Sequence, residues 1–206
     1  MDSKTVYVDF DGTIVDVFAR YYGILKAYIG GKAKEEKLNE YIKMKRSGRK
    51  DHEIAKECWG KNIDISDYLK FKRKNLEEEK WLRTDTVIGE PKNAYNELKK
   101  KGYVVKLLSQ RRSKENFEKQ LGWLGLENAF DDWMIVAPLH ENAKLLFLKS
   151  VIHKEDILIG DGKLEMECAE KLNVQGFFVQ TGLNERIVGK NISDTWKTYN
   201  EVAANI

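Results

Sequence analysis

Short apolar runs that end at polar residues alternate along this chain with stretches of helical periodicity. The first run, 6–8, consists of β-branched and aromatic residues and is typical of a buried strand. Five such runs predict strands, over 6–8, 103–108, 133–136, 157–159 and 177–179. Helices are predicted between and after them, over 91–102, 113–124, 143–151, 166–172 and from 194 onward. Strands that alternate with helices in this way predict βαβ units and a parallel sheet.

The segment 17–85 shows no strand-like alternation. Its apolar residues recur at three- and four-residue steps, which predicts helices over 17–29, 34–46, 51–58 and from Ser66 or Asp67 to 76. Gly30-Gly31, Ser47-Gly48 and Gly60 mark the ends of the first three. Asp51 is the expected N-cap of the third helix. The pattern therefore predicts an all-helical insertion within an α/β domain.

Two carboxylates follow the first strand directly. Asp9 and Asp11 lie where the predicted strand ends and a loop begins, and Gly12 favours a turn directly after them. Open α/β sheets place their ligands at such strand ends. Acids at the end of an apolar strand need a neutralising cation, and their hard oxygen ligands suit Mg²⁺. The alternative is an acidic turn that caps a helix.

The sequence Asp9-Phe10-Asp11-Gly12-Thr13 after an apolar strand resembles the first motif of the haloacid dehalogenase (HAD) superfamily. This resemblance implies that Asp9 attacks phosphorus and that Asp11 is the general acid/base. It also implies that the backbone carbonyl of Asp11 binds the metal. Three later positions match further motifs of the superfamily.

Ser109 ends the second core strand, where the HAD pattern has a Ser or Thr that holds the phosphoryl group; a local turn is its alternative role. Lys144, 17 residues before Asp161, matches the family lysine, although the spacing is short, and Lys149 is the fallback. Without the resemblance, Lys144 reads as a surface lysine. Asp161 between two glycines matches the fourth motif as a metal ligand. Glu165 stands where the family more often has Asp, and Glu167 is a less favoured substitute.

Positive charge is concentrated in the insertion. Residues 17–85 carry 18 Lys and Arg against 12 Asp and Glu, a net charge of +6, which leaves −3 for the remainder of the +3 chain. The stretch 43–50 holds five basic residues and no acid. A basic segment beside an acidic metal site suits an anionic substrate, although solvated helices give the same composition. We predict substrate contacts from the following residues: Thr13, Arg46, Arg49, Gln110 and Arg111.

The HAD resemblance implies a Rossmann-like parallel-sheet core, residues 1–16 and 86–206, with 17–85 as an all-helical C1 cap domain. The implied activity is a Mg²⁺-dependent phosphatase that hydrolyses a phosphomonoester through an aspartyl-phosphate. A phosphomutase would use the same residues, and a catalytically idle binding domain is the alternative from another class. The expected substrate is a small phosphorylated metabolite or a nucleotide, while nucleic acid is less favoured.

The composition, with 42% hydrophobic and 33% charged residues, indicates a globular protein. No apolar run is long enough for a membrane span, and no signal peptide is evident. Cys58 and Cys168 have neither a metal-ligand spacing nor a disulfide framework, so we expect a cytoplasmic protein. The sequence does not predict an oligomeric state.

Overall fold

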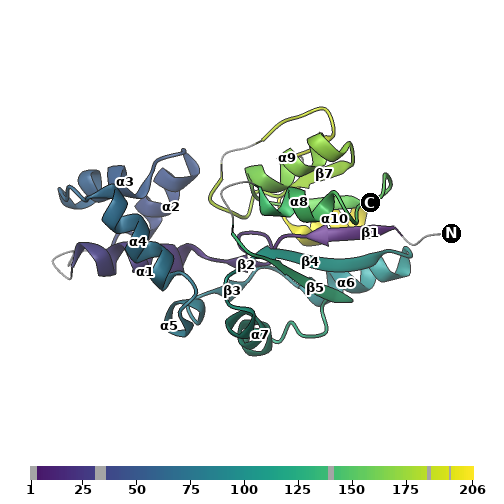
Figure 1. Ribbon diagram of the computed structural model, residues 1–206, viewed down its shortest axis with the longest axis horizontal. Coiled ribbons are helices and arrows are strands. Elements are labelled where there is room, and N and C mark those ends of the chain that lie inside the picture. Colours follow the sequence, from purple (N-terminus) through teal and green to yellow (C-terminus); the bar gives the residue numbers. More distant parts are fainter. Residues whose placement is uncertain (1–3, 31–35, 139–141, 185–186, 195) are drawn as a thin grey trace.

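The computed structural model describes residues 4–30, 36–138, 142–184, 187–194 and 196–206. A six-stranded parallel sheet in the order β5-β4-β1-β6-β7-β8 forms its centre (Figure 1). The strands are β1 (Thr5–Val8), β4 (Val104–Gln110), β5 (Asp132–Val136), β6 (Ile157–Gly160), β7 (Gln175–Phe178) and β8 (Ile192–Ser193). In register, Val6 lies opposite both Val105 of β4 and Ile157 of β6. This is the parallel sheet that the sequence predicts.

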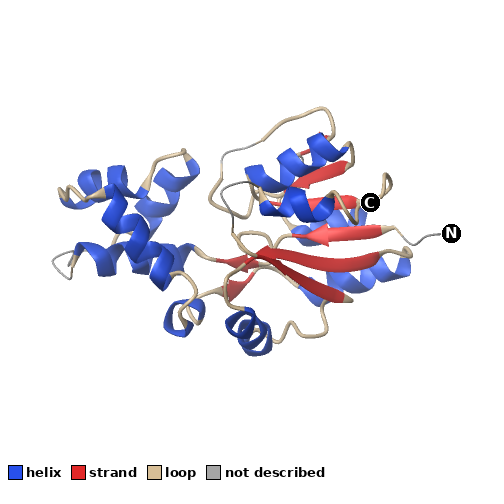
Figure 2. Ribbon diagram, viewed as in Figure 1, coloured by secondary structure: helices blue, strands red, loops and turns tan. Residues whose placement is uncertain are grey.

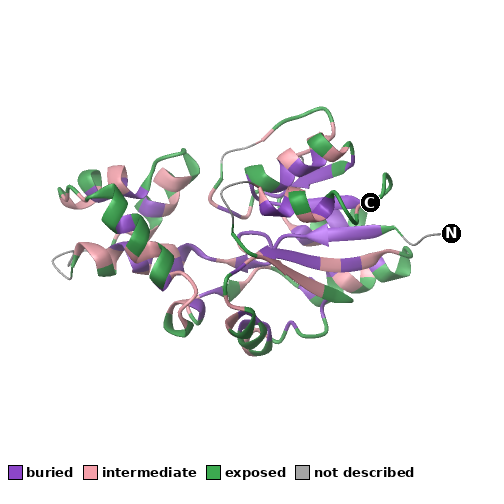
Figure 3. Cartoon of the chain, in the orientation of Figure 1, coloured by how far each residue is buried: buried purple, intermediate pink, exposed green. Residues whose placement is uncertain are grey.

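Helices cover both faces of the sheet (Figure 2). On one face, Val6 and Val8 pack with residues of α6 (Pro91–Lys100), α7 (Lys114–Trp123) and α10 (Tyr199–Asn205). On the other face, Tyr7 and Leu158 pack with α8 (Ala143–Leu148) and α9 (Lys163–Leu172). Successive strand residues point to opposite faces, so β1 is buried along its whole length (Figure 3).

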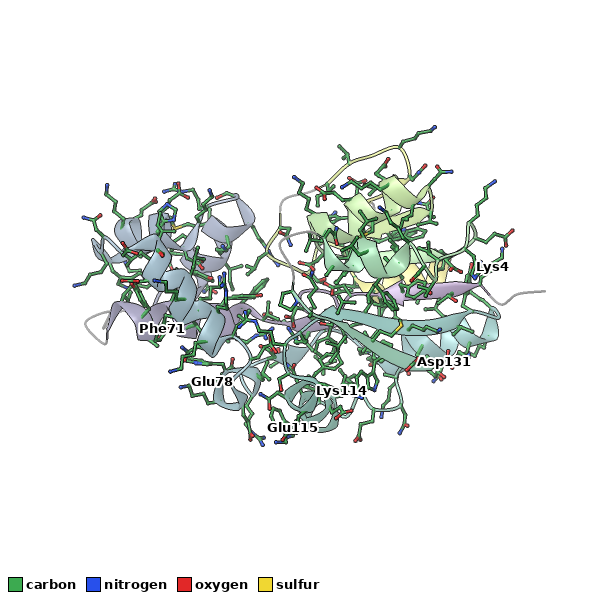
Figure 4. All side chains as sticks on the ribbon, in the orientation of Figure 1. Lys4, Phe71, Glu78, Lys114, Glu115 and Asp131 are labelled. Carbon is green, nitrogen blue, oxygen red and sulfur yellow. The ribbon has the colours of Figure 1, made fainter. Side chains whose placement is uncertain are left out.

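The inserted segment forms a separate group of helices beyond the carboxyl ends of the strands, at the left of Figure 1. These helices are α1 (Phe18–Ile29), α2 (Leu38–Arg46), α3 (Asp51–Trp59) and α4 (Ile65–Asn75). They have their own apolar cluster around Tyr22, Leu25 and Ile54. Next to this cluster, the centroid of the Phe71 ring, labelled in Figure 4, lies 5.4 Å from the centroid of the Tyr28 ring.

Two short strands mark the passage between core and insertion. β2 (Val15–Asp16) leads into α1, and β3 (Thr86–Val87) returns to α6 after the one-turn helix α5 (Glu79–Leu82). β2 and β3 pair in antiparallel fashion. The sequence analysis missed this pair, α5 and β8, because two to four residues are too few to show a period.

Local signals set several helix boundaries as predicted. Pro91 is the first residue of α6, and the Ser113 hydroxyl accepts a hydrogen bond from the backbone N–H of Asn116 at 3.1 Å. Gly60 ends α3 with φ of +63°, in the left-handed region that favours glycine. These caps begin or end helices at the residues that the sequence analysis named.

Other boundaries differ from the expectation. Lys50 is the N-cap of α3, and Asp51 is its first residue, with its side chain committed to interior partners. Asp64, rather than Ser66 or Asp67, caps α4. α9 starts at Lys163 and α10 at Tyr199, against expected starts at 166 and 194. The expected start of the second helix near Lys34 lies outside the described residues.

Candidate active site

Asp9 and Asp11 lie immediately after β1, in a turn fixed by the backbone. The backbone N–H of Asp9 donates to the carbonyl of Ile159 on β6 at 2.8 Å, and three successive N–H groups converge on the carbonyl of Phe10. Gly12 completes the turn with φ of +78°. A Cβ at this position would stand 2.5 Å from Oδ2 of Asp161, so glycine is required for both conformation and space.

Lys144 joins the site from the first turn of α8. Its Nζ lies 2.5 Å from Oδ1 of Asp9 and also donates to Oε1 of Glu165, in the first turn of α9. The side chain of Asn142 caps α8 at the backbone N–H of Leu145, which fixes the turn that carries Lys144. The fallback residue Lys149 is exposed at the other end of α8. The structure thus brings Lys144, not Lys149, to Asp9.

Asp161 reaches the same place from the end of β6. Only 9% of Asp9 and 6% of Asp161 are exposed. Asn184 donates to Oδ2 of Asp161 at 3.0 Å. Burial, together with the nearby Asp9 and Glu165, raises the pKa of Asp161 well above its ordinary value, and burial raises the pKa of Asp9 to about 7 although Lys144 opposes it. Lys144 therefore does not fully compensate the negative charge of the two carboxylates.

This deficit suits a divalent cation. Asp9, Asp161 and Glu165 are three carboxylates that share the ammonium of Lys144. In the described segments, no group of three or more His, Cys, Asp or Glu side chains is arranged as a metal-ion site. Mg²⁺ rarely needs such a group, since it is usually bound by one or two carboxylates, water and substrate phosphate. The donor set is therefore compatible with Mg²⁺ on Asp9 and Asp161.

Asp11 faces two guanidinium groups instead. Arg111 contacts both of its carboxylate oxygens at 2.5 Å, and NH2 of Arg20 lies 2.7 Å from Oδ1. Burial alone would raise the pKa of Asp11, but the two arginines hold it below its ordinary value. Arg111 follows the end of β4, whereas Arg20 comes from α1 and also lies 3.2 Å from Asp85.

The sequence analysis did not identify Arg20 as a site residue. In the structure its side chain is fully buried. The available signal was its spacing, because Arg20 stands four residues before the buried Ile24 and so on the same helical face. A charge on the buried face of a helix is expensive unless it is paired. Here Asp11 of the core and Asp85, the last residue of the insertion, provide that pairing.

Some of the other residues predicted to contact substrate line a cleft, and others do not. Ser109, which is buried, lines a cleft of about 790 Å³ that also contains Asp9, as do Gln110 and Arg49. Arg49 is also paired with Glu57, at 2.7 Å. Thr13, in contrast, is fully buried.

Arg46 occupies a bridging position. Its Nε donates to the carbonyl of Gly182 in the core at 3.2 Å, and its guanidinium lies 5.1 Å from the centre of the Phe18 ring. The contact ties the end of α2 to the loop after β7. The structure therefore directs Arg46 to a backbone carbonyl and places Arg49 on the cleft.

A family model described as haloacid dehalogenase-like hydrolase matches residues 6–179, most of the chain and all four motif positions. The chain belongs to this family. The match includes the β1 turn, the end of β6 and α8, which lie together at one edge of the sheet. A comparison with curated protein sequences finds no match.

Solved structures share this fold over nearly the whole chain. A predicted phosphoglycolate phosphatase from Haemophilus somnus superposes with a TM-score of 0.69 at 16% identity, covering 98% of this chain and 97% of that one. A predicted phosphatase from Clostridium acetobutylicum gives 0.62 at 18% identity, with 89% and 87% covered. A candidate β-phosphoglucomutase from Thermotoga maritima gives 0.59 at 18%, with 98% and 97% covered. At these identities the likeness shows the fold alone.

None of the helices in the described part of the chain combines the length and apolar character needed to cross a membrane.

Proposed function

We propose that this HAD-family protein is a Mg²⁺-dependent phosphomonoester hydrolase that works through an aspartyl-phosphate on Asp9. The observation that carries the proposal is the convergence of Asp9, Lys144 and Asp161 at the carboxyl edge of the sheet, with Asp11 held two residues away by Arg111. Predicted phosphatases and a candidate phosphomutase among the structural neighbours support this chemistry.

In the first half-reaction, a carboxylate oxygen of Asp9 attacks phosphorus and the bond to the leaving oxygen breaks. Asp11, once Arg111 leaves it, takes up a proton from solvent and gives it to that oxygen, and it later takes a proton from the water that attacks the aspartyl-phosphate. Mg²⁺ held by Asp9, Asp161 and the carbonyl of Asp11 would neutralise charge on the phosphoryl oxygens. Lys144 acts on the same charge, and the Ser109 hydroxyl is the proposed hydrogen-bond donor.

Arg111 has a consequence for the order of events. Because it occupies both oxygens of Asp11, the carboxyl group cannot reach a leaving oxygen while this contact lasts. Arg111 lines the cleft and has the planar fork that suits phosphate oxygens. In this proposal an arriving phosphoryl group attracts Arg111 and so releases Asp11. Arg49 and Gln110 are the other proposed substrate contacts, while Thr13 and Arg46 would act by holding the site's surroundings.

The helices α1–α4 serve in this proposal as a C1 cap, residues 17–85, over a core of 1–16 and 86–206. The cleft contains residues of both parts, among them Asp9 from the core and Arg49 from the insertion. A cap in this position would exclude bulk water and select the leaving group. The cytoplasmic location that the sequence analysis expects stays a prediction.

The test is phosphate release by the purified protein from a generic aryl phosphate and from a panel of phosphorylated sugars, nucleotides and hydroxy acids. The expected result is turnover that a chelator abolishes and Mg²⁺ restores. Transfer of phosphate to a second hydroxyl, without release, would identify the phosphomutase alternative. No turnover of any ester with Mg²⁺ present, from folded protein, would leave only the idle binding domain.

A further inference from the structure

A buried carboxylate inside the insertion holds two lysines at the wall of the cleft. Asp51, at the start of α3, is only 6% exposed. The hydroxyl of Tyr41 donates to its Oδ1 at 3.1 Å, and that of Tyr68 donates to its Oδ2 at 2.7 Å. The Nζ atoms of Lys45 and Lys72 lie 3.2 and 2.7 Å from the same two oxygens. Residues from three helices, α2, α3 and α4, thus assemble around one carboxylate.

The two lysines around Asp51 carry more positive charge than its single carboxylate can neutralise. Burial alone would raise the pKa of Asp51, but Lys72 and Lys45 keep it below the ordinary value, so the carboxylate is ionised. One such charge is balanced by one ammonium, and the second ammonium is in excess. Each lysine has three N–H donors and directs one at Asp51. The remaining donors are available for an anion.

Both ammonium groups belong to the wall of the cleft that contains Asp9. The side chains of Lys45 and Lys72 are each 20% exposed. Lys72 also lies 4.6 Å from the centre of the Tyr21 ring, which lines the cleft as well. An excess charge in so enclosed a position is costly unless an anion arrives to pair with it.

Two other cations on this wall have partners of their own. Arg49 is paired with Glu57 at 2.7 Å, and its Nε lies 3.6 Å from Glu53. NH1 of Arg112 donates to the carbonyl of Arg73 at 2.6 Å. The distinction of Lys45 and Lys72 is that they share one carboxylate between them.

We infer that Lys45 and Lys72 form an anion site for a second negatively charged group, a carboxylate or a phosphate, on the leaving group of a substrate whose phosphoryl group lies at Asp9. This inference rests on the proposed phosphomonoesterase function and names its substrate class. The cleft of about 790 Å³ is larger than a phosphoryl group requires and lies within the range of sites for whole metabolites, about 300–1,000 Å³. The expected substrate is therefore a small ester with anionic groups at both ends.

The experiment measures kcat/KM for pairs of phosphomonoesters of increasing chain length. Each pair contrasts an alkyl phosphate whose chain end is uncharged with the ester of equal length that ends in a carboxylate, or in a second phosphate. The wild-type protein should prefer the two-ended anions at one chain length, and the better of the two end groups identifies the source of the charge. Lys72→Met should reduce that preference about 10- to 100-fold through KM, as expected for a lost charge-assisted hydrogen bond.

Three variants make the result decisive. Lys45→Met should act in the same direction, and either single variant should fold because the remaining lysine still balances Asp51. Lys72→Arg keeps the positive charge and should therefore retain most of the wild-type preference for two-ended anions. Lys70→Met is the matched control, since Lys70 lies on the same helix, is exposed and pairs only with Asp67 at 3.4 Å among the described contacts. It should keep the wild-type ratio.

The inference is overturned if the wild type shows no preference for two-ended anions, or if Lys72→Met and Lys70→Met change the ratio equally. In either case, hydrolysis of the alkyl phosphates with uncharged chain ends would leave the proposed phosphomonoesterase function unaffected. If no ester is hydrolysed at all, calorimetric binding of the same two-ended anions still decides the matter. Weaker binding by Lys72→Met than by Lys70→Met supports the anion site, and equal binding refutes it.

Discussion

Arg20 is the buried cation that connects the insertion to the core, and its removal should be expensive. The side chains of Arg20 and Asp85 are both fully buried, with Nε of Arg20 3.2 Å from Oδ1 of Asp85. Arg20 also donates to the carbonyl of Leu76 at 3.2 Å. Arg20→Met fills similar space but leaves Asp85 without its cation. Asp11 is affected less, because Arg111 still contacts both of its oxygens.

The magnitude follows from the uncompensated charge. Breaking a buried ion pair by removal of one partner costs about 3–5 kcal/mol. For a chain of this size that corresponds to a decrease in Tm of about 6–20 °C. Asp85→Asn removes the stranded charge while its side-chain oxygen can still accept from Gln120, which now donates to Asp85 at 2.7 Å. The double variant should therefore regain about 1–3 kcal/mol relative to Arg20→Met.

The assay is urea unfolding of the wild type, Arg20→Met, Asp85→Asn and the double variant. Tryptophan fluorescence reports the extent of unfolding. Lys26→Met is the matched control on α1, because Lys26 forms a surface pair with Glu36 at 3.0 Å and should contribute less than about 1 kcal/mol. The reasoning is refuted if Arg20→Met costs no more than the control. It is also refuted if Asp85→Asn makes the Arg20→Met protein less stable instead of more stable.

Three further predictions concern the site and its surroundings. Asp161→Ala should weaken Mg²⁺ binding, measured by calorimetry, by at least about 100-fold, since even residues behind metal ligands cost 10–100-fold; unchanged affinity would exclude Asp161 as a ligand. Gly12→Ala should abolish turnover and lower Tm, because the added Cβ meets Oδ2 of Asp161 at φ of +78°; a normal rate would contradict the close approach. Burial raises the pKa of the Cys168 thiol to about 11. Alkylation at pH 8 should therefore modify Cys58 well before Cys168 in the folded protein, whereas equal rates would show that Cys168 is accessible.

The parallel core could be predicted from the sequence because each of its main strands is a continuous apolar run. Runs such as 157–159 are buried on both faces and need no alternation to be recognised. Glycine, proline and serine at helix ends supplied most boundaries. The two-residue strands β2 and β3 escaped because pairing between Val15 and Val87 is a tertiary event with no local period.

The candidate site shows the same division. Asp9, Asp11 and Asp161 follow strands, so the topology alone predicts that they share one edge of the sheet. The partners of these acids could not be predicted in this way. Arg111 was expected on substrate, and the structure places it on Asp11.

Asp51 illustrates the limit most clearly. Its place at a helix start favoured an N-cap, yet Tyr41 and Tyr68 bind its side chain across the insertion. Such contacts depend on how α2, α3 and α4 pack together, and helical periodicity specifies which face is buried without specifying which neighbour it meets.

The central claim is that Asp9 carries the phosphoryl group during turnover. The most direct measurement is an acid-quenched reaction with Mg²⁺ and a rapidly hydrolysed aryl phosphate, followed by mass spectrometry of the peptide that contains Asp9. The account predicts that this peptide gains one phosphoryl group in the wild type. It predicts no gain in Asp9→Asn, whose phosphate release should fall by several orders of magnitude while its fold is retained. Phosphorylation of another residue, or near-normal release by Asp9→Asn, would contradict the account.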